Sequence, residues 1–101
     1  MYDSRHLQKL KVMRQAAPEA YAAYEAFTSA ALKDGAIPAK YKELMALAVA
    51  MTTQCPYCID YHKKQARQLG CSDAEISEAV LVAAALRAGA AVTHGAHALL
   101  E

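Results

Sequence analysis

The stretch PAKYKELMALAVAMTTQCPYCIDYHKKQARQLG, residues 38–70, decides the fold. It contains the uninterrupted apolar run LMALAVAM, and Pro56 and Gly70 follow that run. Proline favours the first turn of a helix, and glycine favours the residue just past a helix end. The pattern therefore predicts two helices, one from after Pro38 to about Gln54 and one from Pro56 to Gly70.

The segments on either side of this stretch also predict helices. A capping box, Ser72 with Glu75, opens a helix that we expect Gly89 to end. The other expected elements are a short helix or arm over 4–14, a helix from Pro18 to Asp34-Gly35, and a last helix over 90–100 that Gly95 interrupts. The sequence thus predicts an all-α fold, a single domain over residues 1–101 with a bundle of about six helices.

The composition agrees with helices around a small core. Hydrophobic residues make up 55% of the chain, but 24 of them are alanine, only 7% of residues are aromatic, and tryptophan is absent. Small side chains suit close helix packing, and a strand-rich fold is not expected. The helices over 39–54 and 72–89 are apolar on more than one face, in a chain too short to bury them both. We therefore expect a homo-oligomer.

Charge and hydropathy exclude several classes of partner. Eleven Lys and Arg against ten Asp and Glu leave a net charge of +1, which provides no field to attract nucleic acid or anionic lipid. The longest apolar runs, 44–51 and 79–86, are far shorter than the roughly 18 residues that a membrane span requires. The N-terminus lacks the apolar core of a signal peptide. We expect a cytoplasmic protein without nucleic-acid or membrane partners.

Two of the three cysteines, Cys55 and Cys58, are spaced as in redox or metal sites of a reducing compartment. With Pro56 at the first helical position, Cys55 takes the N-cap and Cys58 the third position, close enough for a disulfide to form and break. Free amides and the helix dipole stabilise a thiolate there, so we expect both thiol pKa values to fall from about 8.5 toward neutral. His62, one turn after Cys58 on the same face, can take the thiol proton.

Glu43 is a single acid within the apolar helix that precedes the cysteines. If the two helices form an antiparallel hairpin, Cys58 lies about 4.5 Å, His62 about 10.5 Å and Glu43 about 18 Å from the turn, at ~1.5 Å rise per residue. Side-chain reach plus one water then joins each to the next. This hypothesis gives a proton relay in which Glu43 orients or recharges His62. The alternative is a solvated Glu43 beside Lys42.

The same residues admit two other interpretations. Cys55, Cys58 and His62 match the donor set of a zinc site, with Cys71 or Glu43 as a fourth ligand. The two cysteines also match a pair of inert packed side chains. In either case the chain would be a non-enzymatic helical oligomer that acts through its surface. A packing role is favoured for Cys71, and a surface or subunit-contact role for the spaced pair His94 and His97.

These residues resemble the carboxymuconolactone decarboxylase superfamily, and specifically its AhpD-like alkylhydroperoxidase branch. The resemblance spans about residues 34–86 and rests on a Glu-x11-Cys-x2-Cys-x3-His pattern over two helices. The residues that carry it are Glu43-Leu44, Cys55-Pro56-Tyr57-Cys58, His62, Ala66-Arg67 before Gly70, Glu75-Ile76 and Glu78-Ala79.

The resemblance implies an all-α subunit in homo-oligomers, often trimers or hexamers, with thiol-dependent peroxidase or disulfide reductase activity. The family roles would make Cys58 the peroxidatic cysteine and Cys55 its disulfide partner, with His62 and Glu43 as the relay. No organic cofactor is implied, and an external dithiol, lipoyl-like or thioredoxin-like, would be the reductant. Tyr57 stands where the AhpD type has a further histidine, and the cysteine pair disfavours lactone decarboxylation.

Overall fold

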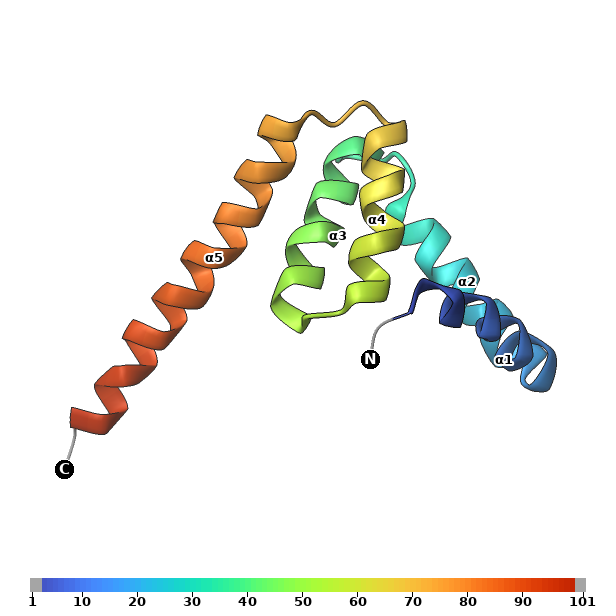
Figure 1. Ribbon diagram of the computed structural model, residues 1–101, viewed down its shortest axis with the longest axis horizontal. Coiled ribbons are helices and arrows are strands. Elements are labelled where there is room, and N and C mark those ends of the chain that lie inside the picture. Colours follow the sequence, from blue (N-terminus) through green and yellow to red (C-terminus); the bar gives the residue numbers. More distant parts are fainter. Residues whose placement is uncertain (1–2, 100–101) are drawn as a thin grey trace.

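The computed structural model describes residues 3–99, apart from the side chains of Ser4 and Leu7, and the elements in that range are helical. Figure 1 shows the arrangement of the helices; the first and the last described elements are 3-10 helices. In chain order the elements are η1 (Ser4–Lys9), α1 (Leu10–Ala16), α2 (Pro18–Leu32), α3 (Ala39–Thr53), α4 (Pro56–Gln68), α5 (Asp73–Gly95) and η2 (Ala96–Leu99). The all-α fold class expected from the sequence is confirmed.

Helices α3 and α4 form the hairpin that positions the site, and they lie side by side in Figure 1. Helix α3 ends where Gln54 adopts a left-handed conformation, with a φ of 56°. Pro56 begins α4 two residues later. After α4, Gly70 takes a φ of 84°, which glycine adopts without steric cost. The short connection therefore holds the first turn of α4 next to the last turn of α3.

Helix α5 packs along the other side of α3. Its capping box is complete: the Ser72 hydroxyl accepts the Glu75 N–H at 3.1 Å, and the Glu75 carboxylate accepts the Ser72 N–H at 2.9 Å. Glu75 also forms an ion pair with Lys40 of α3, at 3.1 Å. Further along α5, Arg87 donates to the carbonyl oxygen of Thr52 at 2.7 Å. These polar contacts fix α5 to both ends of α3.

The core is small and lies where α3, α4 and the start of α5 meet. Its buried cluster is Leu47, Ala66 and Cys71, with Leu44 and Ile76 packed against it. Ala50 of α3 and Ala83 of α5 are also buried, and their small side chains let the helices approach closely. At the opposite side of the hairpin, α1 and α2 pack against each other, and η1 returns to contact α4.

The last two helices expected from the sequence form one helix. Helix α5 continues through Gly89 to Gly95, so five α-helices are described where about six were predicted. A glycine inside a helix costs about 1 kcal/mol but does not end it unless a turn or cap competes. At Gly89 the neighbours are alanines, and a Cβ there would meet no atom within 4 Å apart from those neighbours and the nearby backbone of its own helix. No contact therefore requires a break at this residue.

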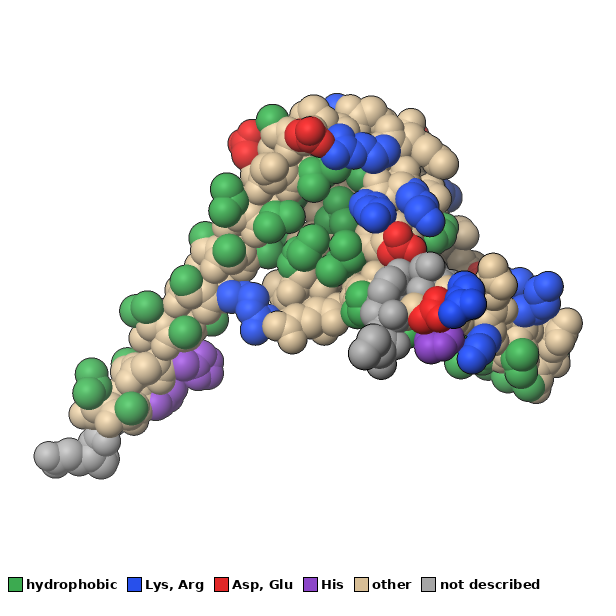
Figure 2. Space-filling model, in the orientation of Figure 1, with side chains coloured by type: hydrophobic (Ala, Val, Ile, Leu, Met, Phe, Trp, Pro, Cys, Tyr) green, Lys and Arg blue, Asp and Glu red, His purple; other side chains and the backbone are tan. Residues whose placement is uncertain are grey.

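Much of the apolar surface of α5 is not covered by any of the described residues. Figure 2 shows hydrophobic side chains spaced along this helix, and Leu81, Leu86 and Val92 are 65%, 68% and 79% exposed. The described chain has 7630 Å² of accessible surface, about 2,000 Å² more than the roughly 5,600 Å² of a compact monomer of this mass. Its radius of gyration is 16.9 Å, against about 13 Å for a compact domain of this length.

The segment Asp73–Leu99 also meets the criteria of length and composition for a helix that crosses a membrane. The mean hydropathy of an 18-residue stretch of this segment is 1.5, and 6% of that stretch is buried. A count of uninterrupted apolar runs does not detect this property, because Arg87 ends the run 79–86 within the segment. Helices that pack in the core of soluble proteins satisfy the same criteria, so length and composition alone assign no membrane role.

Candidate active site

The hairpin turn places the two cysteines at the start of α4. Cys55 is the N-cap residue, and its sulfur accepts the backbone N–H of Cys58 at 3.3 Å. A hydrogen bond joins the two Sγ atoms, which lie 2.6 Å apart. Both cysteines are free thiols; Cys58 is exposed and Cys55 is half-buried. The arrangement holds two sulfur atoms ready to form one bond at the positive end of a helix.

The pKa values of the two thiols are shifted in opposite directions. The pKa of Cys55 is lowered, first by the hydrogen bond from the Cys58 side chain and then by the backbone N–H groups of Cys58 and Tyr57. The pKa of Cys58 is raised to about 11, first by that same side-chain hydrogen bond, then by burial and by the charge on Cys55. The expectation that both values fall was wrong for Cys58. The N-cap sulfur receives the backbone donors and takes the negative charge, so the proton stays on Cys58.

Glu43 and His62 are in direct contact. The His62 Nδ1 atom lies 2.7 Å from Glu43 Oε2, so the pair needs no bridging water. Glu43 is buried, which differs from the solvated alternative, and the His62 side chain is 18% exposed. A carboxylate facing Nδ1 favours a proton on that nitrogen and leaves Nε2 as the basic atom of the ring. His62 is therefore oriented as a proton acceptor one turn along α4 from Cys58.

Tyr61 contributes to the orientation of this histidine. Its ring meets the His62 ring edge to face, with centroids 5.0 Å apart and planes at 89°. The Tyr61 side chain itself is about half exposed.

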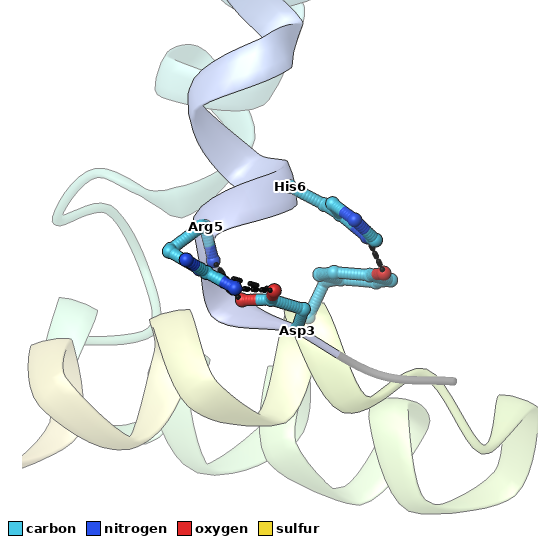
Figure 3. A network of polar contacts seen from close by, with 4 residues as sticks. Asp3, Arg5 and His6 are labelled. Atoms are coloured by element: carbon cyan, nitrogen blue, oxygen red, sulfur yellow. Dashed lines mark hydrogen bonds and ion pairs between the residues drawn. The ribbon is translucent and has the colours of Figure 1, made fainter.

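A second histidine reaches the cysteine turn from the N-terminal segment. His6 Nδ1 lies 3.0 Å from the hydroxyl of Tyr57, the residue directly before Cys58. Figure 3 shows His6 pointing at the tyrosine, with the Asp3–Arg5 ion pair beside it. For residues 4–14 the sequence predicts only a short helix or arm. A contact across 51 positions leaves no local pattern in the sequence, so no signal there could have identified it.

The zinc interpretation lacks a ligand set in the part of the chain that the structure describes. No three His, Cys, Asp or Glu side chains gather there around a common point. Glu43 is engaged by His62, and Cys71 is buried in the core with its sulfur 3.7 Å from the Lys40 carbonyl oxygen. Burial is the main cause of the raised pKa of the Cys71 thiol. These features fit a packing role for Cys71.

His94 and His97 stay close together near the end of α5. Their ring centroids are 5.7 Å apart, with the planes tilted by 49°. Within residues 3–99 no third metal-binding side chain joins them. Both residues are exposed, His94 in α5 and His97 in η2, and both are distant in sequence from the cysteine turn.

Two relatives match most of the chain in sequence. The uncharacterized protein 4 in the cox locus of Paracoccus denitrificans is 47% identical over 77 residues, which covers 76% of this chain and 69% of that protein. An uncharacterized protein of Cupriavidus necator is 31% identical over 85 residues, which covers 84% of this chain and 75% of that protein.

Two crystal structures resemble the fold. The apo form of a carboxymuconolactone decarboxylase family protein from Legionella pneumophila has a TM-score of 0.78 and 33% identity, with 92% of this chain and 83% of that chain covered. A protein from Methanobacterium thermoautotrophicum has a TM-score of 0.79 and 28% identity, with 88% and 99% covered. The model of the carboxymuconolactone decarboxylase family matches residues 18–101, which include every residue of the cysteine turn and of the Glu43–His62 pair. The chain therefore belongs to the carboxymuconolactone decarboxylase family.

Proposed function

We propose that the chain is a thiol-dependent oxidoreductase of the AhpD-like alkylhydroperoxidase type, which reduces a hydroperoxide or a disulfide. Cys55 and Cys58 would cycle between dithiol and disulfide. The observation that carries the proposal is the pair of free thiols, with sulfur atoms 2.6 Å apart at a helix N-terminus. The bonded Glu43–His62 pair one turn along the helix supports it. The family includes AhpD peroxidases.

The first step generates the attacking thiolate. Cys58 has a pKa raised to about 11 by its bond to Cys55, so it needs a base to lose its proton near neutral pH. His62 accepts that proton at Nε2, and the Glu43 carboxylate stabilises the imidazolium that forms. The exposed Cys58 sulfur then attacks the peroxide. The S–O bond forms as the O–O bond breaks, and the leaving alkoxide takes the proton from His62 to become an alcohol.

The second step closes the disulfide. The lowered pKa of Cys55 keeps its sulfur available as a thiolate beside the new sulfenic acid. That thiolate attacks the Cys58 sulfur, so that the S–S bond forms and the S–O bond breaks. The leaving hydroxide takes a proton from solvent, which balances the proton that Cys55 lost when it ionised, and departs as water. The two electrons that reduced the peroxide have then come from the two thiols.

An external dithiol would complete the cycle. A lipoyl-like or thioredoxin-like reductant attacks the Cys55–Cys58 disulfide, passes through a mixed disulfide, and leaves oxidised while both protein thiols are restored. Run in the reverse sense, the same exchange reduces a disulfide substrate. Both reactions require a reducing compartment, so we place the protein in the cytoplasm. We further propose that the subunit works as a homo-oligomer, a trimer or hexamer, whose contacts cover the apolar face of α5.

The test is turnover of an organic hydroperoxide with a dihydrolipoyl compound as reductant, for the wild type and three serine variants. Cys55→Ser and Cys58→Ser should each abolish turnover, because either change removes half of the disulfide. Cys71→Ser is the matched control and should retain turnover, because Cys71 lies in the core away from the turn. A reagent that traps sulfenic acids should label Cys58 in the Cys55→Ser variant after one equivalent of peroxide.

Two results would contradict this proposal. Turnover that survives in both the Cys55→Ser and Cys58→Ser variants would remove the cysteine pair from the reaction. Stoichiometric zinc in the purified protein, together with thiols that resist peroxide, would support the non-enzymatic helical oligomer instead.

A further inference from the structure

The N-terminal segment 3–9 contacts the cysteine turn although it lies outside the part of the chain that the family model matches, which begins at residue 18. Its hydrogen bond from His6 joins it to Tyr57, which stands between Cys55 and Cys58. The ring of His6 also faces the Tyr57 ring, with centroids 6.3 Å apart and planes at 35°. The domain described by the family model therefore receives an additional side chain at its most reactive turn.

The backbone around His6 is fixed by its neighbours in the segment. The Asp3 carbonyl oxygen accepts the His6 N–H at 2.9 Å, and the Asp3 carboxylate accepts the Arg5 N–H at 2.9 Å. The Arg5 guanidinium bonds to the same carboxylate, with its closest contact at 2.7 Å. These bonds close a tight turn that presents the imidazole toward α4, as Figure 3 shows. These bonds hold the backbone of His6 in place independently of its contact with Tyr57.

Tyr57 connects this contact to the sulfur chemistry. It is half-buried in the first turn of α4, and its backbone N–H is one of the groups that stabilise the Cys55 thiolate. A hydrogen bond to the end of its ring restricts how far the residue can turn. The contact therefore ties the first turn of α4, which carries the backbone N–H beside Cys55, to the N-terminal segment.

We propose that His6 is a positioning residue of the thiol site: by holding the Tyr57 hydroxyl it fixes the cysteine turn, so that this one side chain of the N-terminal segment acts on the thiol chemistry. The inference rests on the proposed function, since it assigns His6 a part in that reaction. Its effect is exerted on Cys55 and requires no contact of His6 with substrate.

The experiment measures the rate of Cys55 alkylation against pH in the reduced, full-length protein, by mass spectrometry of the peptide that contains it. His6→Ala and Tyr57→Phe should each shift the profile to higher pH and slow alkylation near neutral pH by about three- to tenfold, the size of one lost hydrogen bond. The double variant should be no slower than either single variant, because both changes break the same contact. His6→Asn, which keeps a polar group at the position of Nδ1, should restore part of the rate.

Gln8→Ala is the matched control, because Gln8 is exposed on the same 3-10 segment, whereas the hydrogen bond to Tyr57 comes from His6. It should leave the profile unchanged, and the thermal unfolding of all variants should be compared to separate positioning from loss of fold. An unchanged profile in His6→Ala would overturn the inference, as would equal shifts in His6→Ala and Gln8→Ala. Failure of the proposed function would appear differently, as wild-type thiols that do not form a disulfide with peroxide.

Discussion

Cys55 and Cys58 share one hydrogen bond between their sulfur atoms, and the position of its proton decides which cysteine carries charge. The backbone N–H of Cys58 points at Cys55, so the N-cap sulfur is the better acceptor. The two cysteines therefore differ in pKa, although their spacing in the sequence gives no reason to distinguish them. The one with the raised pKa is the one that has a histidine a single turn away.

The pKa asymmetry predicts an order of alkylation. The lowered pKa of Cys55 means that its thiolate persists below the pH at which an ordinary cysteine is protonated, whereas Cys58 becomes a thiolate only near pH 11. Iodoacetamide should therefore modify Cys55 first at pH 7, as peptide mapping would show. Cys58→Ala should raise the pKa of Cys55, because it removes the largest cause of the lowering. Preferential modification of Cys58 at pH 7 would show the opposite charge distribution.

The Glu43–His62 contact predicts a catalytic loss in Glu43→Gln. The amide keeps the size and a hydrogen bond but not the negative charge, so the imidazolium of His62 is less stable. We expect peroxide consumption by the reduced protein to slow by at least about tenfold, with the fold retained, in stopped-flow measurements. Glu78→Gln, at an exposed position of α5, is the control and should behave as the wild type. Equal rates in the two variants would exclude Glu43 from the relay.

At the scale of elements, the helix boundaries with a local physical cause could be predicted from the sequence. Pro56 begins α4, Gly70 follows its end with a positive φ, and the Ser72–Glu75 capping box opens α5. Gly89 misled the prediction because a glycine ends a helix only where a cap or turn competes with it.

In the candidate site, too, some contacts could be predicted from the sequence and others could not. Helix α4 begins at the cysteine turn, so helical spacing predicts how Cys55, Cys58 and His62 lie relative to one another. The place of Glu43 beside them was predicted from the assumed hairpin of two helices. The His6–Tyr57 bond depends on tertiary packing alone and could not be predicted. The unequal thiol pKa values could not be predicted either, because they depend on which backbone N–H groups face which sulfur.

The capping box of α5 gives an element-scale prediction. Ser72→Ala removes the acceptor of the Glu75 N–H and should lower the free energy of unfolding by about 1 kcal/mol in urea titrations. Ser77→Ala, within the exposed part of the same helix, should change it little. If both substitutions had the same effect, the cap would contribute nothing to stability.

The same capping box predicts a dependence on pH. The pKa of Glu75 lies below its ordinary value because of the Ser72 backbone N–H first and Lys40 second. A lowered pKa in the folded state means that this stabilisation is present above the ordinary glutamate pKa and disappears as the pH falls through the lowered one. The difference in stability between the wild type and Glu75→Gln should therefore shrink in acid. A difference that stays constant from pH 7 to pH 3 would contradict this.

At the scale of the whole molecule, the chain exposes more surface than a folded monomer of its size needs. Only Leu47 among the large described side chains is fully buried, and most of the apolar side chains of α5 face outward. An excess of about 2,000 Å² is within the range that stable subunit interfaces bury. The expected assembly would therefore supply the burial that the isolated subunit lacks.

A single charge on the apolar face of α5 should separate subunits whose contacts bury that face. Leu86→Glu places a carboxylate on the apolar face of α5 and should shift the mass measured by light scattering from a trimer or hexamer toward a monomer. Ser77→Glu introduces the same charge at an exposed polar position and should leave the mass unchanged. A wild-type protein that is monomeric at micromolar concentration would show that no second copy covers this face.

Peptide-mapping mass spectrometry would show directly whether Cys55 and Cys58 form a redox pair. The reduced protein would be mapped before and after one equivalent of hydroperoxide, with metal content measured on the same sample. We expect a metal-free protein that gains an intramolecular link between Cys55 and Cys58, which a dithiol reverses. Cysteines that remain reduced, or stoichiometric zinc with thiols that resist peroxide, would contradict it.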